Sequence, residues 1–187
     1  MKRMDLIKNL ARLERLGVYV LPKRDLRKIF PVEDEKSLEK SLQRVVKDGL
    51  LVRAAKGIYV NPLGTHRHPG RVIEEVAKAL RPGKISYVSL ESMLSEHGVI
   101  SQIPVSYLTV MTTGASGRHS TPYGEIEFTH TKRSVPDVLE RSVYVEGRPM
   151  RIAKKKAAAQ DLYRVGRNTN MIDREELEEE LEEEVNE

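Results

Sequence analysis

Basic side chains recur at helical spacing between residues 36 and 47 of this 187-residue chain. The stripe consists of Lys36, Lys40, Arg44 and Lys47. Residues spaced by three or four positions share one face of a helix. Lysine and arginine bind nucleic-acid phosphates, and arginine and glutamine match the edges of guanine and adenine. The stripe therefore predicts contact with double-stranded DNA, with Ser41, Gln43 and Arg44 near base edges.

Four further basic residues are predicted to support this contact, namely Lys23, Arg24, Arg53 and Lys56. Lys23 and Arg24 begin the preceding helix, where they are placed for backbone phosphates. Arg53 lies on a strand and Lys56 at a hairpin tip, within reach of a phosphate or the minor groove. A basic helix face is more often simply solvated. Because element order, stripe and tip coincide, DNA binding is favoured over a solvated face or a protein contact.

Three short helices and a hairpin are predicted to position these side chains. Leucines at helical spacing predict a first helix that ends before Gly17. Further helices are predicted over 22–30 and 34–48, followed by strands over 50–53 and 58–60. This order is that of a winged helix-turn-helix domain, here residues 1–62, in which the third helix is the recognition helix.

Residues 63–170 predict a second, α+β domain. Helices are expected over 71–80 and 89–97, and a strand over 85–88. A strand at 106–114 and hairpins at 117–133 and 142–152 predict one antiparallel or mixed sheet, mainly antiparallel and covered by these helices. A last helix is expected over 153–166, with a secondary basic patch of Lys154, Lys155 and Lys156 that contacts phosphate or an acidic partner, or is only solvated.

The charge is distributed unevenly along the chain, although the net value is only +4. Residues 1–170 carry 31 basic and 18 acidic side chains, whereas residues 171–187 carry 1 and 10. The acidic segment is predicted to be a helix or tail that begins at Asp173 and has a thin stripe of Leu177, Leu181 and Val185. It would fold onto the basic body, bind a basic partner or fray.

Candidate catalytic and metal-binding residues are few. Because there is no cysteine, disulfide frameworks, thiolate zinc sites and cysteine nucleophiles are excluded. His66 and His68 lie in a Pro/Gly-rich linker without acidic neighbours, and a solvated loop is favoured over a metal site. Glu125 and Glu127 share a strand face, and cross-strand salt bridges are favoured over metal binding. We therefore expect no catalytic residue, no metal and no cofactor.

The location of the chain is predicted from what the sequence lacks. No stretch approaches the roughly 18–20 apolar residues of a membrane helix. The first residues contain no uninterrupted apolar run of the kind found in secretory signals. A cysteine-free composition fits a reducing compartment. We expect a soluble cytoplasmic protein without a membrane partner.

Four segments resemble the AbiEi-like antitoxins of type IV, abortive-infection toxin–antitoxin systems. They are LVRAAKGIYVNP, YVSLESMLSEHGVISQIP from Tyr87 to Pro104, the strands LTVMTTG and PYGEIEFTHT, and KKKAAAQDLYRVGR. The last places the family's Lys-Ala-then-Asp pattern at Lys156, Ala157 and Asp161. Together the matches span about residues 5–170, and their order is more specific than any single motif.

The resemblance implies a transcriptional repressor whose N-terminal domain binds inverted repeats in its own promoter. It also implies a C-terminal domain that counters a nucleotidyltransferase-type toxin, without a stable complex being required. The expected state is a monomer or weak dimer, with two copies on DNA. The alternatives are a winged-helix regulator whose second domain senses a small ligand, a protein–protein adaptor, and an enzyme that uses Glu125 and Glu127.

Overall fold

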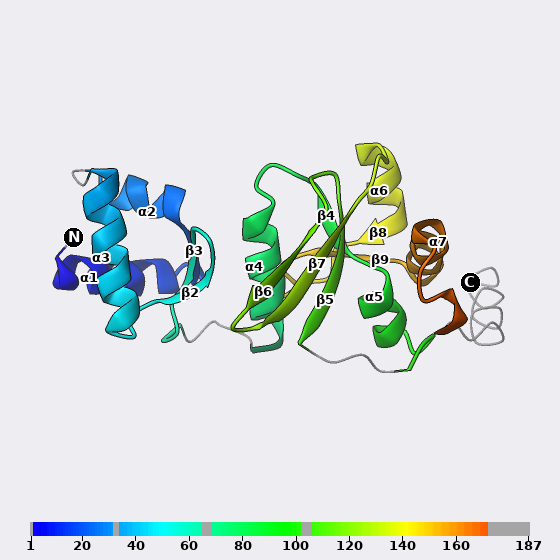
Figure 1. Ribbon diagram of the computed structural model, residues 1–187, viewed down its shortest axis with the longest axis horizontal. Coiled ribbons are helices and arrows are strands. Elements are labelled where there is room, and N and C mark those ends of the chain that lie inside the picture. Colours follow the sequence, from blue (N-terminus) through cyan, green and yellow to red (C-terminus); the bar gives the residue numbers. More distant parts are fainter. Residues whose placement is uncertain (1, 32–33, 65–68, 102–105, 172–187) are drawn as a thin grey trace. The chain divides into compact units, whose positions relative to one another are not determined.

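The protein is mixed α+β and forms two compact units (Figure 1). The computed structural model describes residues 2–31, 34–64, 69–101 and 106–171. Unit 1 comprises Met1–Leu80 with Thr121–Tyr123, and unit 2 comprises Arg81–Ser120 with Gly124–Glu187. His66, His68 and the acidic residues from Asp173 onward, for which the sequence made predictions, lie outside the described residues.

Unit 1 contains the three helices expected from its leucine spacing. They are α1 (Arg3–Glu14), α2 (Lys23–Ile29) and α3 (Glu35–Lys47). Leu6, Leu26, Leu38 and Leu42 are at most 1% exposed and pack together in one core. Burying a leucine side chain stabilises a fold by roughly 1.5–3 kcal/mol, so these residues fix which face of each helix points inward.

A three-stranded antiparallel sheet completes the core of unit 1. The predicted hairpin is confirmed as β2 (Val52–Ala55) and β3 (Ile58–Val60). A third strand, β1 (Val20–Pro22), was not predicted, and it pairs with β3 so that the order is β1-β3-β2. Pro22 cannot donate to a ladder, but it is tolerated here because β1 is an edge strand. A further helix, α4 (Val72–Leu80), contacts β1 and β3.

Unit 2 is built on a six-stranded sheet of order β6-β7-β5-β4-β9-β8. The strands are β4 (Ser86–Val88), β5 (Tyr107–Thr112), β6 (Gly117–Thr121), β7 (Gly124–His130), β8 (Ser142–Val143) and β9 (Arg151–Ala153). The sheet is mixed: β4 pairs with β5 and β8 with β9 antiparallel, whereas β5 pairs with β7 and β4 with β9 in parallel. The chain passes through edge strand β6 before β7 returns beside β5. The strands were therefore predictable, but their neighbours were not.

Three helices accompany this sheet. They are α5 (Glu91–Glu96), α6 (Val135–Arg141) and α7 (Lys155–Val165). Helix α6 was not predicted, although Ser134 and Asp137 form a capping box around its first turn. Short 3-10 turns cover Pro69–Arg71 and Thr169–Met171. No helix in the described part of the chain is long and apolar enough to span a bilayer.

Candidate nucleic-acid interface

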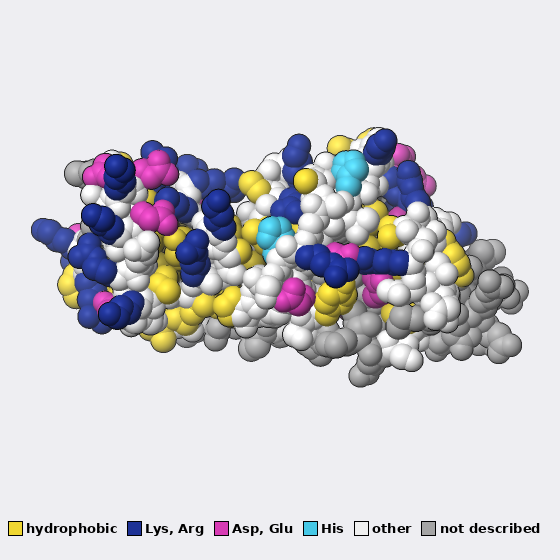
Figure 2. Space-filling view, viewed as in Figure 1, with side chains coloured by type: hydrophobic (Ala, Val, Ile, Leu, Met, Phe, Trp, Pro, Cys, Tyr) yellow, Lys and Arg dark blue, Asp and Glu magenta, His cyan; other side chains and the backbone are white. Residues whose placement is uncertain are grey.

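The candidate interface is the outward face of α3. Asp34 caps this helix by accepting a hydrogen bond from the Ser37 amide at 3.0 Å. Leu38 and Leu42 anchor the opposite face in the core, which turns the basic stripe to solvent. The four basic residues of this α3 basic face, Lys36, Lys40, Arg44 and Lys47, are all exposed. Figure 2 shows Lys and Arg side chains gathered over this part of unit 1.

The α3 basic face surrounds an open hollow of about 540 Å³. Its lining residues are Lys40, Gln43, Arg44 and Lys47. Within the described residues, none of these three cations is paired with a carboxylate. Cationic side chains without carboxylate partners, placed beside the Gln43 amide, can bind an anionic ligand that also carries hydrogen-bonding groups. Nucleic acid has this combination of phosphates and base edges.

Ser41 does not belong to this exposed face, contrary to the prediction. Its side chain is only 3% exposed, and it lies on the same side of the helix as Leu38 and Leu42. Its Oγ accepts a hydrogen bond from the Arg44 Nη2 atom at 3.3 Å. Ser41 therefore contacts Arg44 from the buried side of the helix and is not exposed for contact with a base edge. Gln43 and Arg44 remain as the exposed candidates for base recognition.

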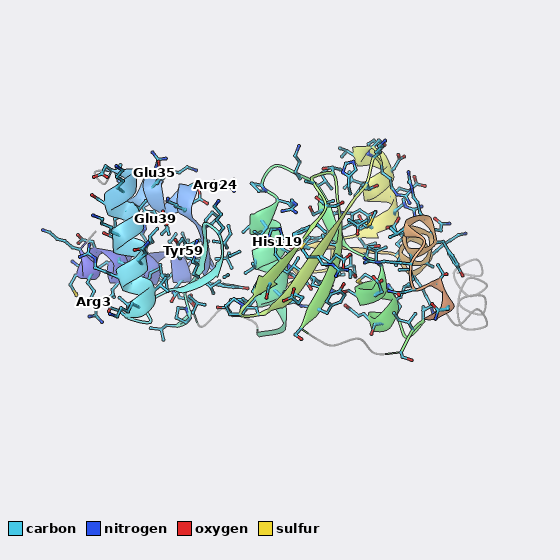
Figure 3. The ribbon with its side chains drawn as sticks, viewed as in Figure 1. Arg3, Arg24, Glu35, Glu39, Tyr59 and His119 are labelled. Atoms are coloured by element: carbon cyan, nitrogen blue, oxygen red, sulfur yellow. The ribbon has the colours of Figure 1, made fainter. Side chains whose placement is uncertain are left out.

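Lys23 is also not available for phosphate in the way predicted. Its ammonium group forms ion pairs with Glu39 and, at 3.5 Å, with Glu35, both on α3 (Figure 3). The hydrogen bond to Glu39 raises the pKa of Lys23, and the same bond lowers the pKa of Glu39. Lys23 therefore ties the start of α2 to α3. The Arg24 side chain is 57% exposed and therefore lies at the surface, with its Nε atom 3.8 Å from the Asp25 carboxylate.

The β2–β3 hairpin carries the other two predicted contacts. Arg53 on β2 and Lys56 in the turn are both exposed, and neither is paired with a carboxylate in the described part of unit 1. Gly57 has a φ of 76°, a conformation that the turn requires and that favours glycine. Its carbonyl accepts the Lys23 amide at 2.7 Å, which fastens the turn to the start of α2. This hydrogen bond fixes the hairpin turn in which Lys56 lies.

The predicted basic patch at the start of α7 is split by the fold of unit 2. Lys154 and Lys156 are exposed, whereas Lys155 is only 6% exposed. Lys155 faces inward because it precedes the buried Ala158 and Ala159 on the packed side of the helix. The three lysines therefore do not present a common surface to a phosphate. The patch is reduced to two exposed cations.

Other basic side chains in unit 2 are bound to buried carboxylates. Asp161 is fully buried and accepts hydrogen bonds at 2.9 Å from both the Tyr87 and Ser89 hydroxyls. Arg133 donates to it at 2.7 Å and Arg141 at 3.5 Å. Burial and the Asp161 carboxylate raise the pKa of Tyr87, which keeps its hydroxyl a donor. Asp161, singled out by the family resemblance, therefore joins β4, α6 and α7.

Glu127 forms a second such cluster on β7. It accepts hydrogen bonds from Tyr107 and Arg167, and Arg118 of the neighbouring strand lies 3.1 Å away. Burial would raise the pKa of Glu127, but the bonds from Tyr107 and Arg167 outweigh it, so the pKa lies below its ordinary value. Glu125 is exposed and does not join the cluster. Glu127 makes the predicted cross-strand salt bridge, whereas Glu125 does not pair with it as a second ligand.

Among the described residues, no group of three or more histidine, aspartate or glutamate side chains is placed to hold a metal ion.

No protein-family model matches the chain, and neither the curated proteins nor the solved structures include a significant match. The α3 basic face is therefore characterised by its own geometry and charge.

Proposed function

We propose that unit 1 is a winged helix-turn-helix that binds double-stranded DNA. Helix α3 would lie in the major groove, and the β2–β3 hairpin would act as the wing. The observation that carries the proposal is the α3 basic face, in which Lys40, Arg44 and Lys47 surround an open hollow without carboxylate partners among the described residues. The three-stranded order β1-β3-β2 supports it, because the hairpin is held on a sheet and not on a loop.

The contacts divide by the chemistry of their side chains. Arg44 and Gln43 have the shapes that pair bidentately with guanine and adenine, and both line the hollow. Lys36, Lys40 and Lys47 are point charges suited to phosphates on either side of the groove. Arg53 and Lys56 extend the cationic surface onto the hairpin. The proposal therefore predicts both a sequence-dependent and a salt-dependent component of binding.

We further propose that the chain is a transcriptional repressor with antitoxin activity. This part is supported by the ordered resemblance to AbiEi-like antitoxins alone. Promoter inverted repeats would take two copies, one for each half-site. Growth rescue tests the antitoxin role, because the chain expressed with a nucleotidyltransferase-type toxin encoded beside it should restore growth. Failure of rescue would remove the antitoxin role and leave DNA binding untouched.

DNA binding is tested by fluorescence anisotropy with the native promoter and a scrambled duplex at two salt concentrations. The expected result is tighter binding to the promoter at both salts and weaker binding to both duplexes as salt rises. Binding that is independent of salt, or no binding to either duplex, would overturn the proposal. Salt-independent capture of a protein would then favour the adaptor alternative.

A further inference from the structure

An acidic side chain, Glu39, lies at the edge of the α3 basic face. Glu39 follows Lys36 by three residues and precedes Gln43 by four, so these side chains form one row along the helix. Figure 3 labels Glu39 on α3, and its side chain is 40% exposed. DNA phosphates repel an exposed carboxylate. Glu39 can therefore contribute to DNA binding only through a group other than phosphate.

The carboxylate of Glu39 is ion-paired on one side and open on the other. Lys23 donates a hydrogen bond to its Oε2 atom, and no donor among the described residues lies at its Oε1 atom. The hydrogen bond from Lys23 and the charge of that lysine lower the pKa of Glu39, and the charge of Arg53 adds to this. Glu39 is therefore ionised at neutral pH and keeps one oxygen available as an acceptor.

Lys23 holds this carboxylate in a defined place. The Lys23 amide donates to the Gly57 carbonyl at 2.7 Å, and its side chain is only 23% exposed. The lysine is thus fixed by the hairpin turn through its backbone and by Glu39 through its side chain. A side chain that is ordered before binding loses less conformational entropy when it makes a contact. Glu39 is therefore preorganised to accept a hydrogen bond from a ligand.

The position of Glu39 along α3 fits a base contact. A recognition helix in the major groove presents side chains at spacing i, i+3, i+4 and i+7 to the base edges, as the homeodomain helix does. On α3 this spacing is met by Lys36, Glu39, Lys40 and Gln43. In a helix docked by this row, Glu39 lies beside Gln43 and faces base edges.

The chemistry of a carboxylate selects among the four bases. An ionised carboxylate only accepts hydrogen bonds. In the major groove cytosine presents the N4 amino donor, whereas guanine presents two acceptors and thymine one. Adenine places an acceptor, N7, directly beside its amino group. A fixed carboxylate therefore matches cytosine best.

We propose that Glu39 is a specificity-determining residue that accepts a hydrogen bond from the N4 amino group of a cytosine in the major groove. The inference rests on the DNA binding proposed for unit 1, and it adds the preferred base at one position of each half-site. Lys23 and Arg53 offset the charge of Glu39, which lowers its repulsion from the phosphates on either side of the groove.

The test is competition fluorescence anisotropy with the full chain, the native promoter duplex and duplexes in which each base pair of a half-site is replaced in turn. For the wild type, replacing one C·G pair should weaken binding by roughly fivefold to tenfold, the lower end of base discrimination, because one hydrogen bond is lost. Glu39→Gln should change the preferred base at that position from cytosine to adenine, since a glutamine amide pairs bidentately with adenine. Glu39→Ala should remove the preference there without creating one for adenine.

Two matched variants separate base recognition from general charge. Glu35 also contacts Lys23, but it precedes the buried Leu42 by seven residues and so lies nearer the packed side of α3. Glu35→Gln removes the same charge as Glu39→Gln and should leave the preferred base at every position unchanged. Lys23→Gln breaks the ion pair but keeps the Glu39 carboxylate, and cytosine should remain the preferred base.

The outcomes distinguish this inference from the function on which it rests. Unchanged base preferences in Glu39→Gln, or the same change in Glu35→Gln, would overturn the role of Glu39. The proposed DNA binding would still stand if Arg44→Ala narrowed the preference of the chain for the promoter over scrambled DNA. If the wild type bound neither duplex, both proposals would fall.

Discussion

The basic side chains on α3 of unit 1 and those around Asp161 and Glu127 in unit 2 have opposite environments. On α3 of unit 1, Lys40, Arg44 and Lys47 line an open hollow and have no carboxylate partner among the described residues. In unit 2, Arg133 and Arg167 donate to carboxylates that are at most 9% exposed. The same residue types thus form the surface proposed to bind DNA in one unit and hold buried carboxylates in the other. What separates the roles is the presence of a buried acid and not the number of basic residues.

The largest effect is expected on the stability of unit 2, where buried Asp161 holds Arg133 and Arg141. Asp161→Asn removes the charge that Arg133 and Arg141 neutralise, while it keeps the size of the side chain. Breaking a buried pair from one side costs about 3–5 kcal/mol of unfolding free energy. Urea unfolding followed by circular dichroism measures this loss. An exposed carboxylate on the same unit, Glu125, is the control, and Glu125→Gln should change stability by less than about 0.5 kcal/mol.

A wild-type midpoint for Asp161→Asn would show that the buried cluster does not hold unit 2 together. The contrast would then fail, because the basic residues around Asp161 would not stabilise unit 2. DNA affinity of this variant, measured at a temperature where it is folded, should match that of the wild type. A selective loss of affinity would instead give Asp161 a role in binding.

The intermolecular role predicts the next largest effect. Arg44→Ala should weaken promoter binding by about 1–3 kcal/mol and should narrow the preference over scrambled DNA, because a base contact is lost. Its unfolding free energy should stay within about 0.5 kcal/mol of the wild type, since the side chain is exposed and its hydrogen bond to Ser41 is long, at 3.3 Å. Arg164→Ala removes an equal charge from an exposed position on α7 and should leave the preference intact. Equal losses on both duplexes would exclude Arg44 as a specificity residue.

The helices and the face of α3 could be predicted because both depend on local periodicity. Leu38, Leu42 and Val45 determine which side of α3 is buried, and the basic stripe follows on the other side. The same periodicity could have excluded Ser41, which lies three residues after Leu38 and completes the buried pattern. The two exposed base-contact candidates, Gln43 and Arg44, were thus available from the sequence.

The remaining features depend on contacts between distant residues. Lys23 is ion-paired with Glu39, sixteen positions later in the chain. The β5–β7 pairing is parallel because β6 lies outside it, and no local pattern fixes that order. Strand β1 is only three residues long and ends in proline, so it gives almost no periodic signal. The sequence therefore did not show which distant side chains and strands pair with one another.

A smaller effect is expected at the hairpin. Lys56→Ala should weaken binding to promoter and scrambled DNA alike and reduce the slope of log affinity against log salt by about 1, because one phosphate contact is lost. Anisotropy titrations at several salt concentrations measure the slope. Arg164→Ala serves as the charge-matched control and should leave the slope unchanged. A loss confined to the promoter would assign Lys56 to base recognition instead.

The smallest effect on DNA is expected at Lys23, and it tests the contrast within unit 1 itself. Lys23→Gln removes a charge that Glu35 and Glu39 already neutralise, so promoter affinity and salt slope should both stay near those of the wild type. Lys40→Gln removes the same charge from the hollow and should lower both.

The ion pair should appear instead in the pH dependence of unfolding. Since the Lys23 bond lowers the pKa of Glu39, the pair stabilises the fold above the ordinary glutamate pKa. This stabilisation is lost as pH falls through the lowered value in the folded state. Lys23→Gln should flatten that acid limb, whereas Lys40→Gln should keep it. If Lys23→Gln weakened DNA binding as much as Lys40→Gln does, then a carboxylate partner would not remove a cation from the interface, and pairing would fail as the property that distinguishes the two sets of basic residues.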